Sequence, residues 1–86
     1  MTASTNTGPT RVFVQLRCRP GTAYDVADRI YEREIVSELY STSGEWDLFM
    51  IIYIPSGEEI GRFINDKILD IPNIDRSLTT LTFKAF

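Results

Sequence analysis

The chain of 86 residues contains no histidine and a single cysteine, Cys18. Histidine is the commonest general base and metal ligand at neutral pH, so its absence excludes Ser-His and Cys-His catalysis. One cysteine forms neither an internal disulfide nor a zinc-binding set, and in a strand it is expected to be a buried thiol. We therefore predict no catalytic residues of these classes, no metal site and no cofactor.

The sequence also lacks signals for membranes, secretion and nucleic acids. No apolar run approaches the roughly 18 residues of a membrane span, and no basic, apolar leader precedes the domain, so a cytoplasmic location is expected. The formal net charge is -3, and the arginines are interspersed with acidic residues instead of forming a positive footprint. The glycines at 57 and 61 lack the lysine and the spacing of a P-loop. Neither direct DNA binding nor nucleotide binding is predicted.

Residues 1–10 contain almost no apolar side chains, and we expect them to form a flexible tail. The remaining residues, 11–86, are predicted to form one small domain. A domain of this length buries only about 60–65% of its unfolded surface. Association with another chain would therefore add stability that the single domain lacks.

Hydrophobic periodicity predicts a strand and then a helix at the start of this domain. Apolar and polar residues alternate from about 11 to 19, which is typical of a strand, and Pro20-Gly21 ends it. Thr22 and Asp25 resemble a capping box that opens a helix. The apolar stripe expected on this helix comprises Ala23, Val26, Ala27, Ile30 and Tyr31.

The rest of the domain reads as a hairpin, a second helix and a final strand. A second strand is predicted at about 35–42, and a tight turn connects it to a third at 47–54. Ser56, with Glu59 three residues later, predicts the N-terminus of the second helix. The final strand is expected at about 74–83, where β-branched residues are frequent. The apolar stripe of the second helix comprises Ile60, Phe63, Ile64 and Ile68.

The order βαββαβ predicts a ferredoxin-like α+β fold, with a four-stranded antiparallel sheet and both helices on one face. The third strand is apolar on both faces, and it is expected in the interior of the sheet. On the face without helices it exposes Phe49, Ile51 and Tyr53. We expect two such faces to pack together, which makes the chain a homodimer of the dimeric α/β-barrel type.

The hairpin is polar, and it carries Gly44 and Asp47 close to Tyr40 in the sequence. A glycine lets backbone N–H groups approach a small carboxylate, and an aspartate can hold an ammonium group. These are the two halves of an amino-acid site, with threonine hydroxyls of the final strand as further partners. Glycine and aspartate are also common in turns, and threonine in strands, for conformational reasons alone. The residues themselves leave both interpretations open.

Three sequence patterns resemble those of a known family. They are a valine-rich strand ending in Pro-Gly at 12–21, a Thr-x-Gly-x-x-Asp hairpin at 42–47, and Ile-Pro-Asn-Ile at 71–74 before a threonine-containing strand at 77–82. Together they are similar to the effector-binding (RAM) domain of the Lrp/AsnC transcription regulators. Asn73 replaces the usual glycine of the family, and asparagine tolerates the same left-handed backbone.

The resemblance implies a non-enzymatic domain whose dimers assemble into tetramers, octamers or rings. It also implies that an amino acid or related small metabolite binds in a cleft between dimers. Regulators of the family carry a helix-turn-helix ahead of this domain, and the ten residues before Arg11 are too few for one. A stand-alone form is therefore expected, which would modulate transcription through full-length Lrp/AsnC paralogues. The effector residues that the family implies are Tyr40, Gly44, Asp47, Thr79, Thr80, Leu81 and Thr82.

Two other functions remain open from the sequence. The first is a small dimeric α/β-barrel enzyme, such as a cofactor-free monooxygenase or isomerase, for which Arg17 and Tyr53 are the candidate residues. The second is a purely structural oligomerisation module, in which the hairpin is only a turn.

Overall fold

A computed structural model describes residues 8–86 of the chain. The predicted order of elements is confirmed, and their bounds are β1 Thr10–Cys18, α1 Ala23–Glu32, β2 Glu38–Ser41, β3 Leu48–Ile54, α2 Ile60–Lys67 and β4 Ile74–Leu81. Of the tail predicted for residues 1–10, residues 1–7 lie outside the described part of the chain. No helix within residues 8–86 is long and apolar enough to cross a membrane.

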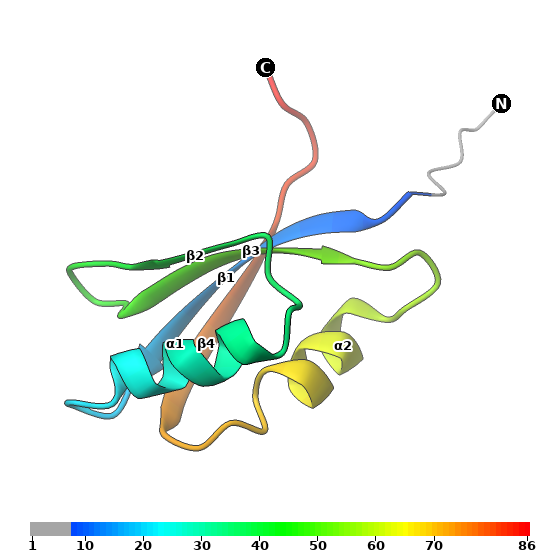
Figure 1. Cartoon of the computed structure of the whole chain (residues 1–86). Coiled ribbons are helices and arrows are strands. Elements are labelled where there is room, and N and C mark those ends of the chain that lie inside the picture. Colours follow the sequence, from blue (N-terminus) through cyan, green and yellow to red (C-terminus); the bar gives the residue numbers. More distant parts are fainter. Residues whose placement is uncertain (1–7) are drawn as a thin grey trace, which may run out of the picture.

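The four strands form one antiparallel sheet in the order β2-β3-β1-β4. Both helices lie on the same side of this sheet, as Figure 1 shows, so the predicted ferredoxin-like fold is confirmed. The register places Gln15 at the centre of β1 opposite Phe49 on one side and Leu78 on the other. The two edges of the sheet are therefore β2 and β4, and β3 is an interior strand as predicted.

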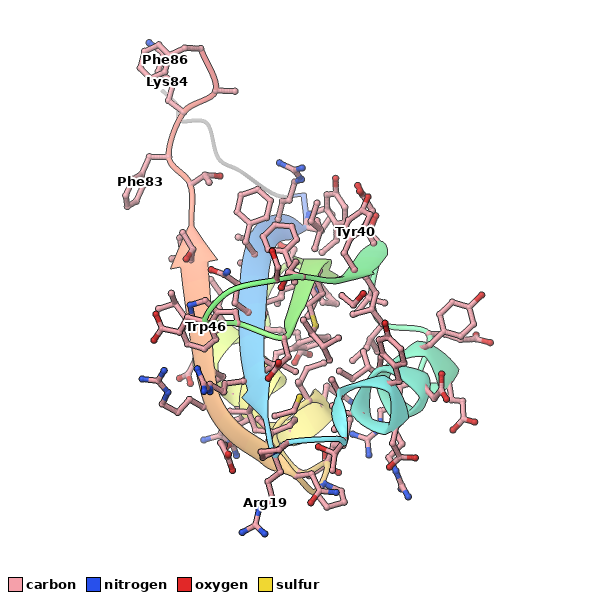
Figure 2. The ribbon with its side chains drawn as sticks, turned by 90° about the vertical axis from the view of Figure 1, so that its left-hand side faces the viewer. Arg19, Tyr40, Trp46, Phe83, Lys84 and Phe86 are labelled. Atoms are coloured by element: carbon pink, nitrogen blue, oxygen red, sulfur yellow. The ribbon has the colours of Figure 1, made fainter. Side chains whose placement is uncertain are left out.

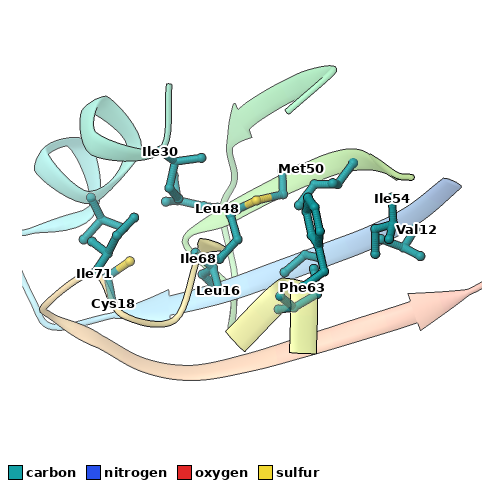
Figure 3. Close-up of a cluster of buried hydrophobic side chains, with 14 residues drawn as sticks. Val12, Leu16, Cys18, Ile30, Leu48, Met50, Ile54, Phe63, Ile68 and Ile71 are labelled. Carbon is teal, nitrogen blue, oxygen red and sulfur yellow. The ribbon is translucent and has the colours of Figure 1, made fainter. Parts of the chain in front are cut away.

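The core lies between the sheet and the helices (Figure 3). Alternate residues of the two central strands point toward the helices, because side chains of a strand alternate between the two faces. Each large apolar side chain buried in this way contributes about 1.5–3 kcal/mol to folding. The core consists of Val12, Val14, Leu16 and Cys18 of β1, Leu48, Met50, Ile52 and Ile54 of β3, and Val26, Ile30, Phe63, Ile64, Ile68 and Ile71 from the helices and the segment after α2.

The first helix differs in two details from the sequence prediction. Thr22 is its N-cap residue but makes no side-chain cap; its hydroxyl instead donates to the carbonyl of Arg19 at 2.7 Å. Tyr31, predicted on the packed stripe, is 73% exposed, because Val26 and Ile30 already fill the contact with the sheet. The buried stripe of α1 is therefore narrower than the periodicity indicates.

The second helix begins later than predicted. Ser56 lies in the preceding turn, and Glu59 takes the N-cap position with an extended backbone and no side-chain cap. The predicted apolar stripe is otherwise observed, since Phe63 and Ile64 are buried within the helix. Ile68, which follows the helix, is fully buried.

Two connecting segments have backbone conformations that matter for the sheet. The second strand is shorter than predicted, because residues 35–37 form the connection from α1, with the N–H of Ser37 donating to the carbonyl of Ile51 at 2.8 Å. Asn73 has a φ of 75°, which is the left-handed conformation expected where the family has glycine. Its carbonyl accepts a 2.9 Å hydrogen bond from the N–H of Arg19 and so joins the start of β4 to the end of β1.

Candidate functional site

The hairpin between β2 and β3 is held closed by its own hydrogen bonds. The N–H of Thr42 donates to the carbonyl of Asp47 at 2.9 Å, and the Thr42 hydroxyl donates to the carbonyl of Trp46 at 2.7 Å. At the tip, Gly44 has a φ of 94° and open space where a side chain would be. A side chain there would strain the backbone, so glycine is needed for the conformation of the turn.

Asp47 continues the ladder between β3 and β1. Its N–H donates to the carbonyl of Leu16 at 2.9 Å, and its Oδ2 accepts a 2.8 Å hydrogen bond from the N–H of Cys18. This second bond gives a partner to an N–H of β1 that lies beyond Leu16 and Leu48, the last paired residues of β1 and β3. The carboxylate of Asp47 is thus held in a fixed position, half-buried at the base of the hairpin.

Only one oxygen of this carboxylate has a protein partner within residues 8–86, because every hydrogen bond found there for the Asp47 side chain is made by Oδ2. A carboxylate has about four lone-pair sites and can accept several donors. The geometry therefore fixes Asp47 through Oδ2 and leaves Oδ1 for another donor, such as an ammonium group.

Cys18 lies next to this carboxylate and is buried. Burial raises the pKa of its thiol above the ordinary value, and the negative charges of Asp47 and Asp75 raise it further. A thiol with a raised pKa stays protonated at neutral pH and is a poor nucleophile. Cys18 is accordingly a core side chain, as expected from the sequence.

The hairpin loop leans across β1 toward β4, as Figure 2 shows for Trp46. Arg17 of β1 donates through Nη1 to the carbonyl of Glu45 at 2.9 Å. Arg76 of β4 forms an ion pair with the Glu45 carboxylate at 2.7 Å, and its guanidinium lies 5.2 Å from the centre of the Trp46 ring. These contacts fix the loop to two strands, although sequence reasoning singled out neither Arg76 nor a loop-anchoring role for Arg17. Arg17 and Arg76 are opposite each other on neighbouring strands, so their side chains point to the same face of the sheet. This pairing is visible only once the strand register is known.

The predicted effector residues of the last strand point in two directions. Thr79 and Leu81 pair with Val14 and Val12 and lie on the helix side, whereas Thr80 pairs with Phe13 on the opposite face. Thr82 follows the end of β4. One side of the strand alone can therefore offer only part of the predicted set to a ligand.

Tyr40 lies at the other edge of the sheet from these residues. Its hydroxyl donates to the carboxylate of Glu38, a bond that raises the pKa of Tyr40, and its ring lies 6.3 Å from that of Phe49. Two strands, β3 and β1, separate Tyr40 on β2 from the threonines on β4. At about 4.8 Å per strand spacing, the two groups are about 14 Å apart. A single chain does not bring the predicted effector residues together.

The candidate residues of the enzyme alternative are also separated. Tyr53 pairs with Arg11 at one end of β1, and Arg17 lies at the other end of that strand. Six residues of strand span about 20 Å. One chain therefore does not place Arg17 and Tyr53 in a common pocket, and two surface hollows on the helix side, beside Tyr31 and beside Tyr24, contain neither residue.

The face of the sheet opposite the helices has an aromatic and apolar middle, with Arg11 toward one end and Arg17 and Arg76 toward the other. The rings of Phe13 and Phe49 stack with their centroids 5.6 Å apart. Tyr53 is 48% exposed and Leu78 is 45% exposed on the same face, whereas Ile51 is only 6% exposed and is already covered within the chain. Of the three predicted interface residues, Phe49 and Tyr53 therefore present accessible surface, and Ile51 presents little.

Comparison with known proteins adds to this geometry. A sequence model of the Lrp/AsnC ligand binding domain matches residues 11–86. The chain belongs to the Lrp/AsnC family. An uncharacterized HTH-type transcriptional regulator of Pyrococcus horikoshii is 32% identical over 77 residues, which cover 86% of this chain and 51% of that protein. The chain spans about half the length of the curated relatives that it matches.

Solved structures of other proteins share this Lrp/AsnC fold. TTHA0845 from Thermus thermophilus superimposes with a TM-score of 0.79 at 28% identity, over 90% of this chain and 96% of that one. The transcriptional regulator NMB0573 of Neisseria meningitidis, solved as a complex with L-Met, has a TM-score of 0.76 at 14% identity, over 98% of this chain and 59% of that one. The relatives found by sequence are named as transcriptional regulators. Within residues 8–86, no group of three or more His, Cys, Asp or Glu side chains is arranged to hold a metal ion.

Proposed function

We propose that this Lrp/AsnC domain is a non-enzymatic sensor that binds an amino acid, or a closely related small metabolite, at the hairpin formed by residues 42–47. The single observation that supports this most directly is the fixed carboxylate of Asp47, which is held through Oδ2 while Oδ1 has no protein donor within residues 8–86. The L-Met complex of the Neisseria meningitidis regulator supports the class of ligand by analogy. Such a sensor acts in the cytoplasm by altering the activity of full-length Lrp/AsnC paralogues.

In this proposal each end of the ligand has its own partner. The ammonium group of the amino acid donates to Oδ1 of Asp47, and the carboxylate accepts hydrogen bonds from backbone N–H groups near Gly44, where no side chain blocks the approach. Charge-assisted hydrogen bonds of this kind are about twice as strong as neutral ones. Part of the set Thr79, Thr80, Leu81 and Thr82 completes the site, since Thr79 and Leu81 lie on one face of the last strand and Thr80 on the other.

Because Tyr40 and the last strand are separated within one chain, we propose that a second copy completes the site. Those residues lie at opposite edges of one sheet, so a ligand that contacts both sets must lie between chains. We propose a homodimer that packs through the helix-free face, with Phe49 and Tyr53 in contact with the partner and Ile51 largely covered within its own chain, and that assembles further into tetramers, octamers or rings. A ligand at such an interface favours the assembly that binds it best, so binding and assembly are coupled.

The test begins with the mass of the purified chain by light scattering, with and without the twenty amino acids at millimolar concentration. We expect at least one amino acid to change the mass or to raise the thermal midpoint. A chain that responds to none of the twenty contradicts the amino-acid proposal and favours a structural module.

The role of Asp47 is tested with Asp47→Asn, because the amide oxygen can still accept from the Cys18 N–H while the negative charge is lost. We expect the affinity for the identified amino acid to fall about tenfold or more in calorimetric titration, with the fold retained by circular dichroism. Asp75→Asn is the matched control, since Asp75 is a nearby exposed carboxylate paired with Arg19 at 3.9 Å. Unchanged affinity in Asp47→Asn would show that Asp47 does not hold the ligand.

A further inference from the structure

The five residues that follow β4 leave the body of the molecule as an extended arm, which we define as residues 82–86. Phe83 is 97% exposed and Phe86 is fully exposed, which makes them the most exposed large apolar side chains of the described chain. In Figure 2 the labelled Phe83, Lys84 and Phe86 lie clear of the sheet and of both helices. In Figure 1 the C-terminus lies beyond the sheet, away from the layer of helices.

The arm does not pair with the sheet within the described residues. The last β1 partner of β4 is Val12, opposite Leu81, so the arm makes no ladder contacts even though β1 continues to Thr10. The aromatic contact found in the arm is internal, with the Lys84 ammonium 5.1 Å from the centre of the Phe86 ring. An exposed phenylalanine does not contribute the free energy that its burial would provide. Burying one such side chain in an interface raises the association constant about tenfold or more.

The direction of the arm indicates what covers it. It continues beyond the end of β4 and away from the layer of helices. The sheet face opposite those helices is the one that exposes Tyr53 and Leu78. Facing sheets of a dimer pack about 10 Å apart. An extended segment of five residues spans about 17 Å, so the arm is long enough to cross that gap and reach the flank of a second sheet.

We infer that residues 82–86 are an arm that packs its two phenylalanines on the flank of a second copy of this chain, so that each subunit clasps the other across the helix-free faces. The inference rests on the face-to-face dimer of the proposed function. In this arrangement the arm begins at Thr82, directly after Leu81, so closing the arm on the partner also fixes the end of the strand that carries the proposed effector residues.

The experiment is sedimentation equilibrium over a dilution series of four chains. They are the natural chain, the arm variant Phe83→Ser with Phe86→Ser, the face variant Tyr53→Asp, and the control Tyr24→Ser, whose tyrosine is 73% exposed on α1 at the helix side. Circular dichroism checks that each chain is folded, which we expect because all four side chains are exposed in the single chain.

We expect the dimer dissociation constant of the arm variant to rise at least about tenfold, that of Tyr24→Ser to stay unchanged, and Tyr53→Asp to be monomeric. If Tyr53→Asp is monomeric while the arm variant dimerises like the natural chain, the arm inference alone is overturned. If Tyr53→Asp still dimerises, the proposed dimer face is wrong, and the inference that depends on it fails as well.

Discussion

At the residue scale, Asp47 shows how one carboxylate can serve the fold and remain available for a ligand. Its Oδ2 bonds the N–H of Cys18, which lies beyond Leu16 and Leu48, the last paired residues of β1 and β3. A buried N–H without a partner costs free energy, and an ionised acceptor is the strongest available replacement. The hydrogen bond from Cys18 therefore orients the Asp47 carboxylate, and this orientation directs Oδ1 to the proposed ligand.

The structural part of this role predicts a loss of stability in Asp47→Ala. Removing the acceptor leaves the half-buried N–H of Cys18 without its partner, so we expect the free energy of unfolding to fall by about 1–3 kcal/mol. Asp47→Asn keeps an acceptor oxygen and should lose clearly less. Urea unfolding at pH 7 measures both changes, and equal losses in the two variants would contradict the assigned hydrogen bond.

Sequence reasoning anticipated some of these single-residue features and missed others for a physical reason. The left-handed backbone of Asn73 and the positive φ of Gly44 follow from local steric preferences, which a sequence displays directly. The bond from Cys18 to Asp47 joins residues 29 apart, and the contact of Arg76 with Glu45 joins residues 31 apart. Such contacts depend on strand register and on a bulge, neither of which a local pattern fixes.

At the element scale, the strands and helices were predictable where an apolar period was strong. The alternation in β1 predicts its buried face correctly, and β3, which is apolar on both faces, is an interior strand as predicted. The ends of both helices were less predictable. Thr22 and Ser56 have the right chemistry for capping, but Thr22 bonds to Arg19 and Ser56 belongs to a turn, so local preference was outweighed by the paths of the connections.

The ion pair between Arg33 and Asp70 links the C-terminus of α1 to the segment after α2. Arg33 donates through Nη1 and Nη2 to the two carboxylate oxygens of Asp70, at 2.5 and 3.1 Å, and to the carbonyl of Lys67 at 2.9 Å. The hydrogen bond from Arg33 lowers the pKa of Asp70, and the same bond raises that of Arg33. A bidentate ion pair of this kind links the two helices more strongly than a single hydrogen bond at the surface.

This pair predicts a pH dependence with a definite sign. Because the pKa of Asp70 is lowered by folding, its stabilising contribution is present at pH values above the unfolded pKa and is lost as the pH falls through the folded value. We therefore expect Asp70→Asn to be less stable than the natural chain at pH 7, with a difference that shrinks as the pH is lowered below about 4. Urea midpoints between pH 7 and pH 2.5 test this.

Asp28→Asn provides the control for this measurement, because Asp28 is an exposed aspartate of α1 that forms no ion pair within residues 8–86. Its midpoint should remain close to that of the natural chain at pH 7. A stability difference for Asp70→Asn that stays constant down to pH 2.5 would show that the ion pair is not the source of the effect.

At the scale of the whole molecule, the two faces of the sheet are covered unequally. The helices bury the facing side chains of the two central strands, β1 and β3, whereas the other face retains the exposed parts of Tyr53 and Leu78 beside the stacked rings of Phe13 and Phe49. A domain of 86 residues has a small core, and an aromatic face of this kind is typical of an interface between subunits. Folding and association of this chain should therefore be linked.

The linkage predicts that thermal stability depends on protein concentration. If the native state is a dimer and the unfolded state is a monomer, a hundredfold rise in concentration stabilises the dimer by about 2.7 kcal/mol, which corresponds to an increase of about 5–10 °C in the calorimetric midpoint. Tyr53→Asp should have a lower midpoint that no longer changes with concentration, because the charged side chain opposes burial of the helix-free face. A natural chain whose midpoint is independent of concentration would instead be a monomer that leaves this face in water. A second copy could then not complete the proposed effector site, and that part of the proposal would fail.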